Sequence, residues 1–172
     1  MTVVWQPCGA GARILRVLGD SPCPVLPREV AGRPVTELGP YCFAARPVTQ
    51  GFRWPADSQE THEVTGDFLE EVVLPYTLRV LHSAVFYNCH RLRRVEVGPL
   101  LESLGSDLFT NCRSLQTFVL HAAPDEDTGL KKLLGAVSAD VAVEFTGAPG
   151  ARLFYPEYFE LLDENTPAHI FN

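Results

Sequence analysis

Apolar positions recur in the middle of this chain at a fixed interval of 23 residues. Leu69 and Leu92 begin the pattern Leu-x-x-Val-x-Leu/Val, and the pattern starts again at Leu115 as LQTFVL. Such alternation predicts a short strand with buried and exposed positions. A fixed period of about 20–50 residues is typical of a solenoid, in which one small unit stacks on copies of itself. We therefore predict a repeat architecture and a binding role rather than chemistry.

The two complete units share more than their first strand. The positions that match are Leu69/Leu92, Val72/Val95, Leu78/Leu101, Leu81/Leu104, Phe86/Phe109, Asn88/Asn111 and Cys89/Cys112. Pro75 and Pro99 suit a turn after the strand, because proline has no N–H for the ladder. Ser83 and Ser106 are in place to cap one or two helical turns. The predicted fold class is an α/β solenoid: short parallel strands, a second extended piece, and a short helical turn in each unit.

A weaker copy lies upstream, where VLP at 25–27 matches Val73-Leu74-Pro75 and residues 35–43 match the second half of a unit. Residues 47–68 are polar, contain Pro and Gly, and are typical of an insertion. We predict a β-hairpin cap over 1–24, a solenoid of about three and a half units over 25–120 with insertion 47–68, and a C-terminal cap over 121–172. Within that cap, 128–137 predicts an amphipathic helix and 141–145 a strand.

The segments VLPREVAGRPVTELGPYCF and LPYTLRVLHSAVFYNCHRLRRVEV resemble the BspA-type leucine-rich repeats of bacteria, whose consensus is roughly LxxVxLPxxLxxIGxxAFxxCxx. The resemblance covers residues 25–120. It implies a right-handed solenoid with parallel strands, and a recognition module of a kind often found on cell surfaces. Residues 153–172 are similar to a segment in uncharacterised leucine-rich-repeat proteins of gut Firmicutes, in which more chain usually follows. The sequence is therefore expected to be a fragment.

Composition and charge restrict the classes of partner and the compartment that the sequence favours. The net charge of −7 argues against nucleic acid and against an anionic membrane, since both need a basic stripe. No apolar run approaches the roughly 20 residues of a membrane span, and no signal peptide is visible. Five cysteines form no framework, which suits a reducing compartment. These features favour a cytoplasmic monomer, while a secreted or surface location stays open if a leader has been removed.

Most residues with attractive chemistry have a structural interpretation. Stacked units bring Cys89 and Cys112 within disulfide range, but their side chains run parallel, so two buried thiols are favoured over a bond. Asn88 and Asn111 are expected to form a hydrogen-bonded ladder. In-register charges predict the pairs Glu70–Arg93, Glu71–Arg94 and Arg79–Glu102. The histidines lack metal spacing, His82 is expected to face solvent, and no nucleophile or phosphate-loop motif occurs. We predict no catalytic, cofactor-binding or metal-binding residue, and no enzyme.

The function favoured by the sequence is a non-enzymatic protein-interaction module. Its candidate contacts are solvent-facing strand residues and residues of the insertion, namely Arg93, Arg94, Glu96, Gln116, Phe52, Arg53 and Trp54. Two alternatives stay open. In the first, the chain is a scaffold or recognition domain of a longer protein with activity beyond residue 172. In the second, a carbohydrate-binding surface is formed by Phe154, Tyr155, Tyr158 and Phe159, which would otherwise pack within the cap.

Overall fold

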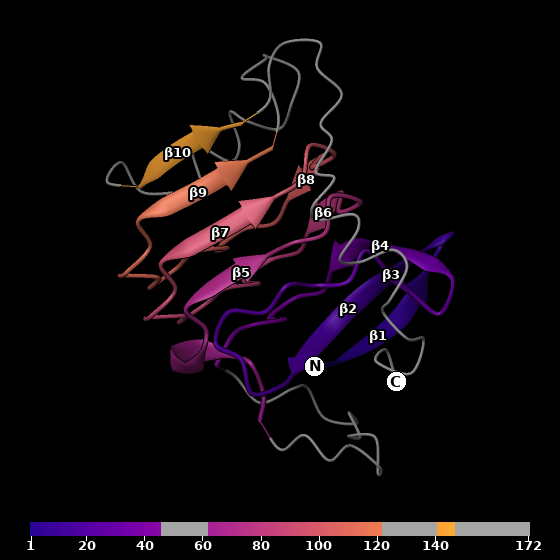
Figure 1. The fold of residues 1–172 in the computed structure, drawn as a ribbon, viewed down its shortest axis with the longest axis horizontal. Coiled ribbons are helices and arrows are strands. Elements are labelled where there is room, and N and C mark those ends of the chain that lie inside the picture. Colours follow the sequence, from indigo (N-terminus) through magenta and orange to yellow (C-terminus); the bar gives the residue numbers. More distant parts are fainter. Residues whose placement is uncertain (46–61, 122–140, 147–172) are drawn as a thin grey trace.

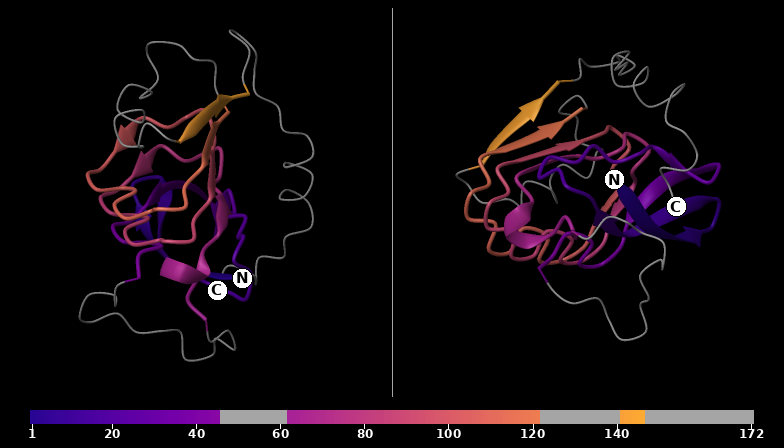
Figure 2. Two further views of the ribbon diagram at one scale, coloured as in Figure 1. Left: turned by 90° about the vertical axis from the view of Figure 1, so that its left-hand side faces the viewer. Right: turned by 60° about the horizontal axis from the view of Figure 1, so that its bottom comes forward.

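The structure, a computed structural model, describes residues 1–45, 62–121 and 141–146. Its first element is an antiparallel hairpin of β1 (Thr2–Cys8) and β2 (Gly11–Leu18), joined at Gly9, whose φ of +55° suits glycine in a tight turn. The chain then coils, and the coils stack away from this hairpin (Figures 1 and 2). Within these residues no helix is long and apolar enough to cross a membrane.

Two sheets form from the stacked coils. The strands after the hairpin are β3 (Glu29–Val30), β4 (Arg33–Leu38), β5 (Glu71–Val73), β6 (Val80–Leu81), β7 (Arg94–Val97), β8 (Ser103–Leu104), β9 (Thr117–Leu120) and β10 (Ala142–Phe145). One sheet has the order β1-β2-β4-β6-β8, with β3 paired to β4, and the other has the order β10-β9-β7-β5. In Figure 1 the second sheet lies in front and its strands stack like rungs.

The 23-residue interval is the register of these sheets. In β5, β7 and β9, Val72 lies beside Val95 and Val95 beside Phe118, all in parallel strands. The upstream copy follows the same rule, because Leu38 pairs with Leu81 and Val25 forms a parallel bridge to Val73. The predicted solenoid and its upstream copy are therefore confirmed. The predicted strand near 141–145 is also present, as β10.

The predicted helical turns are wrong. Among the described residues the one helix is η1 (Gly66–Phe68), a single 3-10 turn. After β6 the backbone N–H groups of Ala84, Phe86 and Asn88 instead donate to carbonyls of the next coil, at 2.8, 3.1 and 3.0 Å. An α-helix needs each N–H to bond within its own segment, four residues back. The positive φ angles of Ala84 and Asn88, 58° and 60°, also exclude right-handed helix there.

The turns before and after this one obey the same geometry. Tyr41, Asp107 and Asn111 likewise have positive φ, and Phe43 N donates to Val85 O at 2.9 Å. Ser83 and Ser106 cap no helix, since their hydroxyls meet each other at 3.4 Å across two coils. The solenoid is thus a β-structure throughout its described part, with a third hydrogen-bonded face made of turns rather than helices.

Between the sheets and the turn face lies one apolar core. Its centre is a column of aromatic rings in which Phe86 stacks on Phe43 at 5.5 Å and on Phe109 at 5.3 Å, with nearly parallel planes. Phe118 closes the column edge-on at 5.9 Å. Leucines 38, 69, 78, 81 and 92 are fully buried around it. The in-register repeat therefore places like side chains on like, which fixes the stacking of coils.

Arg16 completes the first coil. In the turns that follow, carbonyl groups accept hydrogen bonds from the preceding coil, but the turn at 40–45 has only the hairpin before it. Arg16, 2% exposed on β2, donates from Nη1 to the carbonyl oxygens of Tyr41, Cys42 and Ala44 at 2.7, 3.2 and 2.9 Å. A buried guanidinium with several donors suits this task. The hairpin thus terminates the turn ladder with a side chain.

The close stacking of coils predicts a steric effect at Gly105. A Cβ built there would lie 2.3 Å from the backbone nitrogen of Ser83 and 2.5 Å from the carbonyl carbon of His82. We expect Gly105→Ala to lower the free energy of unfolding by about 2 kcal/mol or more, because the backbone of the neighbouring coil must move to make room for the methyl group. Urea denaturation measures this. Gly19→Ala is the control, since its Cβ would meet nothing closer than 3.4 Å; equal losses in both variants would contradict the prediction.

Removing the guanidinium of Arg16 is the second test of the fold. Arg16→Met keeps most of the side-chain volume but leaves buried carbonyl groups without their charged donor, so we expect a loss of about 2–4 kcal/mol in the free energy of unfolding. Arg33→Met is the matched control, because among the described residues Arg33 makes one hydrogen bond, an exposed one to Gly9 O at 3.1 Å. A wild-type urea midpoint for Arg16→Met would show that the carbonyl groups find other donors.

Candidate interaction surface

Four of the predicted contact residues, Arg93, Arg94, Glu96 and Gln116, lie in the strands of the sheet β5-β7-β9-β10 or immediately before them. Along these strands, side chains alternate between the core and the outside. Val72, Val95 and Phe118 are buried in the core, so Glu71, Arg94 and Thr117, one position earlier in each strand, lie on the outer side. All three are half-buried, whereas Gln116, just before β9, is exposed. The face is held from behind by the core and is therefore rigid.

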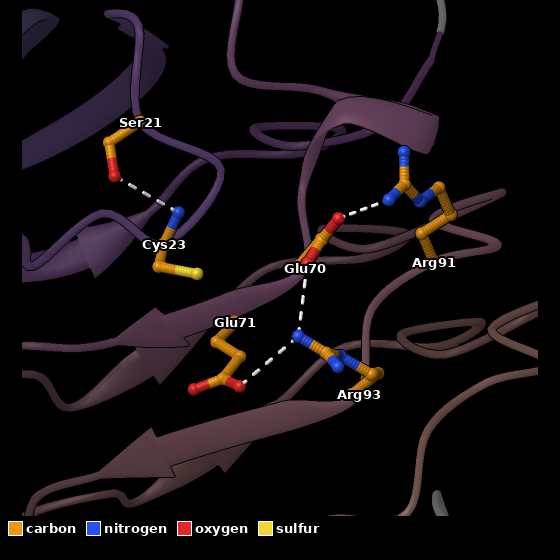
Figure 3. A network of polar contacts seen from close by, with 6 residues as sticks. All are labelled: Ser21, Cys23, Glu70, Glu71, Arg91 and Arg93. Atoms are coloured by element: carbon orange, nitrogen blue, oxygen red, sulfur yellow. Dashed lines mark hydrogen bonds and ion pairs between the residues drawn. The ribbon is translucent and has the colours of Figure 1, made fainter.

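An ion-pair network occupies the edge where these strands begin (Figure 3). Arg93 Nη2 lies 3.0 Å from Glu70 Oε2 and 3.5 Å from Glu71 Oε1, and Arg91 also pairs with Glu70. The arginine side chains are 63% and 50% exposed for Arg91 and Arg93, whereas Glu70 is 21% exposed. The backbone N–H of Glu70 donates to Pro22 O at 2.8 Å, which anchors the backbone of this residue.

The charge pairs predicted from register are confirmed in part. Glu70–Arg93 is present, and Arg79 pairs with Glu102 across β6 and β8. The third pair, Glu71–Arg94, is wrong at the side-chain level although the two residues are register neighbours. Arg94 turns instead to Glu96 in its own strand, with Nη1 to Oε2 at 2.7 Å. Register therefore fixes backbone neighbours but leaves long side chains a choice between partners.

Glu96 is not the solvent-facing contact that the sequence predicted. It is 8% exposed, and His121, 9% exposed, binds its Oε1 through Nε2. The other ring nitrogen of His121 lies 2.6 Å from Thr146 Oγ1, just past β10. Val119, which pairs with Glu96 in register, is 1% exposed yet lies outside the core cluster. This end of the outer face is therefore buried, and the exposed part is the edge where the strands begin.

The hydrogen bond from His121 lowers the pKa of the Glu96 carboxyl; burial opposes this, and Arg94 adds to the lowering. Glu37 on β4 has a similar environment. Burial raises its pKa, but hydrogen bonds from His82 and Arg13, both at 2.7 Å, outweigh burial and lower the pKa overall. His82 is thus bound to a carboxylate and only partly exposed, which corrects its predicted role as a free surface residue.

The cysteine column is a structural feature. Cys89 Sγ donates to Phe43 O at 3.2 Å and Cys112 Sγ to Phe86 O at 3.0 Å, and all five cysteines are free. Burial raises the pKa of Cys89, and raises the pKa of Cys42 and of Cys112 to about 12, so these thiols stay protonated. The predicted absence of a bond between Cys89 and Cys112 agrees with the structure, in which Cys89 is buried as expected and Cys112 is only partly buried.

The asparagine ladder is confirmed as well. Asn111 Nδ2 donates to Asn88 Oδ1 at 2.8 Å, and both residues have the positive φ that asparagine tolerates. Of the predicted contact residues, Arg93 and Gln116 are exposed, and Arg94 is half-buried. Phe52, Arg53 and Trp54 lie outside the described residues, as do the aromatic side chains at 154–159 and the helix predicted at 128–137. No group of three potential metal ligands occurs in the described part of the chain.

His121 and Thr146 were missed by the sequence analysis for an identifiable reason. His121 follows the last recognisable repeat, and its register equivalent in the preceding coil is Gly98, so no matching position drew attention to it. The signal that was available is the distance from Thr117 to Ala142, 25 residues, close to the repeat length. A strand at 141–145 can therefore be placed in register, which puts Thr146 beside His121.

Comparison with known proteins identifies the repeat. A family model described as "BspA type Leucine rich repeat region (6 copies)" matches residues 64–126. This segment is a BspA-type leucine-rich-repeat region. The "Crystal structure of T. pallidum Leucine Rich Repeat protein" matches with a TM-score of 0.54 and 20% identity over 83% of this chain. The chain spans 61% of that crystallised chain, and the likeness supports the fold. No curated protein matches the chain.

The buried Glu96 of the BspA-type region predicts an acid-dependent stability. Because its folded pKa is lowered, its contribution is complete above the unfolded value of about 4.3 and is lost as the pH falls through the folded pKa. We expect the wild type to exceed Glu96→Gln by about 1 kcal/mol in free energy of unfolding at pH 6, with the difference shrinking below pH ~4. Urea denaturation across this range measures it, with exposed Glu144→Gln as control. A difference that stays constant with pH would contradict the role of ionised Glu96.

Proposed function

We propose that the BspA-type region presents the strand-beginning edge of the β5-β7-β9-β10 sheet as a rigid surface for another protein. Leucine-rich-repeat domains typically mediate protein–protein interaction. The observation that supports this site is exposure at the start of the strands. Val95 and Phe118 are locked in the core, while Arg93 and Gln116, which immediately precede β7 and β9 on consecutive coils, are exposed.

Pre-organisation is the physical basis of the proposal. Gln116 N donates to Arg93 O at 2.9 Å and Arg93 N to Glu70 O at 2.7 Å, so the backbones that carry these side chains are bonded to each other. A partner that binds here orders few additional groups, which lowers the entropic cost of association. Because the opposite end of the face is occupied by the Glu96–His121–Thr146 contacts, the contact area is confined to the beginning of the strands.

Site-specific photo-crosslinking tests this proposal. We expect p-benzoylphenylalanine at Gln116 to give an adduct with one partner protein in extracts of the source organism, identified by mass spectrometry. The matched control is Gln6, an exposed glutamine on β1 of the other sheet. Loss of the Gln116 adduct on adding Arg93→Glu would support the surface. Adducts of equal yield at both positions, or at Gln6 alone, would contradict it.

A further inference from the structure

The arginines at this edge indicate the chemistry of the partner. Resting on the proposed function, we infer that Arg91, Arg93 and Arg113, together with Gln116, form a site for an acidic peptide segment of the partner protein. Arg113 follows His90 by one repeat, and Gln116 follows Arg93 by one repeat, so the four side chains belong to two adjacent coils. Equivalent positions in adjacent strands are about 4.8 Å apart.

The charges at this edge change sign from coil to coil. The coil that begins β5 contributes three carboxylates, those of Asp67, Glu70 and Glu71. The next coil contributes His90, which meets Asp67 at 2.7 Å, and the arginines at 91 and 93. The third coil contributes Arg113, Ser114 and Gln116, and its segment 113–117, which reads RSLQT, has no acidic residue. Arg91 and Arg93 thus meet carboxylates of the β5 coil on one side, whereas segment 113–117 offers them none on the other.

Arg113 is the decisive side chain. It is exposed and makes no ion pair with any residue that the structure describes. Arg91 and Arg93 share the carboxylates of Glu70 and Glu71 and keep 63% and 50% of their side-chain surface exposed. By contrast, Arg13, Arg79 and Arg94 each pair with a carboxylate elsewhere in the described structure. An incoming carboxylate would therefore meet guanidinium donors that the fold leaves partly unused.

Arginine is suited to carboxylate recognition because its planar fork offers paired N–H donors, and it stays charged at any working pH. The described residues contain arginines but no lysine. A short peptide fits better than nucleic acid, since the arginines form a compact group and not the extended basic stripe that a nucleic-acid backbone needs. Gln116 adds an amide that can bond to the peptide backbone.

The test uses a fluorescein-labelled hexaglutamate peptide and fluorescence anisotropy at low ionic strength with the whole chain. We expect saturable binding that weakens about three- to tenfold in Arg113→Gln and in Arg91→Gln, and that falls with added salt. The control is Arg33→Gln, which removes the same charge from the β4 side of the molecule and should bind as the wild type. Circular dichroism melts check that the variants fold; both substituted arginines are exposed.

Two further arms separate this inference from the proposed function. Unlabelled hexaglutamate should compete with the partner for the photo-crosslink at Gln116. If the crosslink forms but hexaglutamate neither binds nor competes, the acidic-peptide inference is overturned while the interaction surface stands. If an oligophosphate of equal charge binds more tightly than hexaglutamate, the arginines recognise phosphate rather than carboxylate, which also overturns the inference. Equal affinity for Arg113→Gln and Arg33→Gln would place the binding elsewhere.

Discussion

The structure depends on backbone hydrogen bonds that join each coil to the next. In the turn face, Ala84, Phe86 and Asn88 give their N–H groups to the following coil, and the parallel strands on the other faces do the same. Since no coil satisfies its own backbone, none is stable alone, and stability comes from stacking. This requirement fixes the 23-residue register, and the register in turn places Phe43, Phe86 and the residues around them in columns.

The same constraint explains which predictions from the sequence hold. Columns of like residues are visible as a repeat, so the register of Leu38 with Leu81 and the contact of Asn88 with Asn111 could be predicted. The conformation of the turns could not be predicted in this way, because nothing local in the segment SAVFYNC indicates a positive φ at Ala84. That angle follows from the hydrogen bonds that the turn makes to the next coil. Propensity favoured a helical turn, and the inter-coil hydrogen bonds overrode it.

Side-chain partners were predictable only where one choice exists. Arg93 finds Glu70 as register suggests, but Arg94 has carboxylates both across the sheet and along its own strand, and it takes Glu96. His121 then reaches diagonally to that glutamate. A diagonal contact needs the side-chain lengths and directions of two coils, which an aligned repeat does not contain. Of the residues proposed for the surface, Arg93 and Gln116 are therefore exposed as expected, whereas Glu96 is buried.

The two ends of the outer face differ in how firmly their polar groups are held. At the strand ends, Glu96 and His121 are about one-tenth exposed, and breaking a buried pair leaves an uncompensated polar group. At the strand beginnings, Arg91 and Arg93 are half exposed or more, and exposed ion pairs contribute only about 0–1 kcal/mol each. The guanidinium groups can therefore exchange Glu70 and Glu71 for another carboxylate at small cost. A rigid backbone that carries exchangeable charges combines low ordering entropy with adaptable polar contacts, which favours binding at this edge.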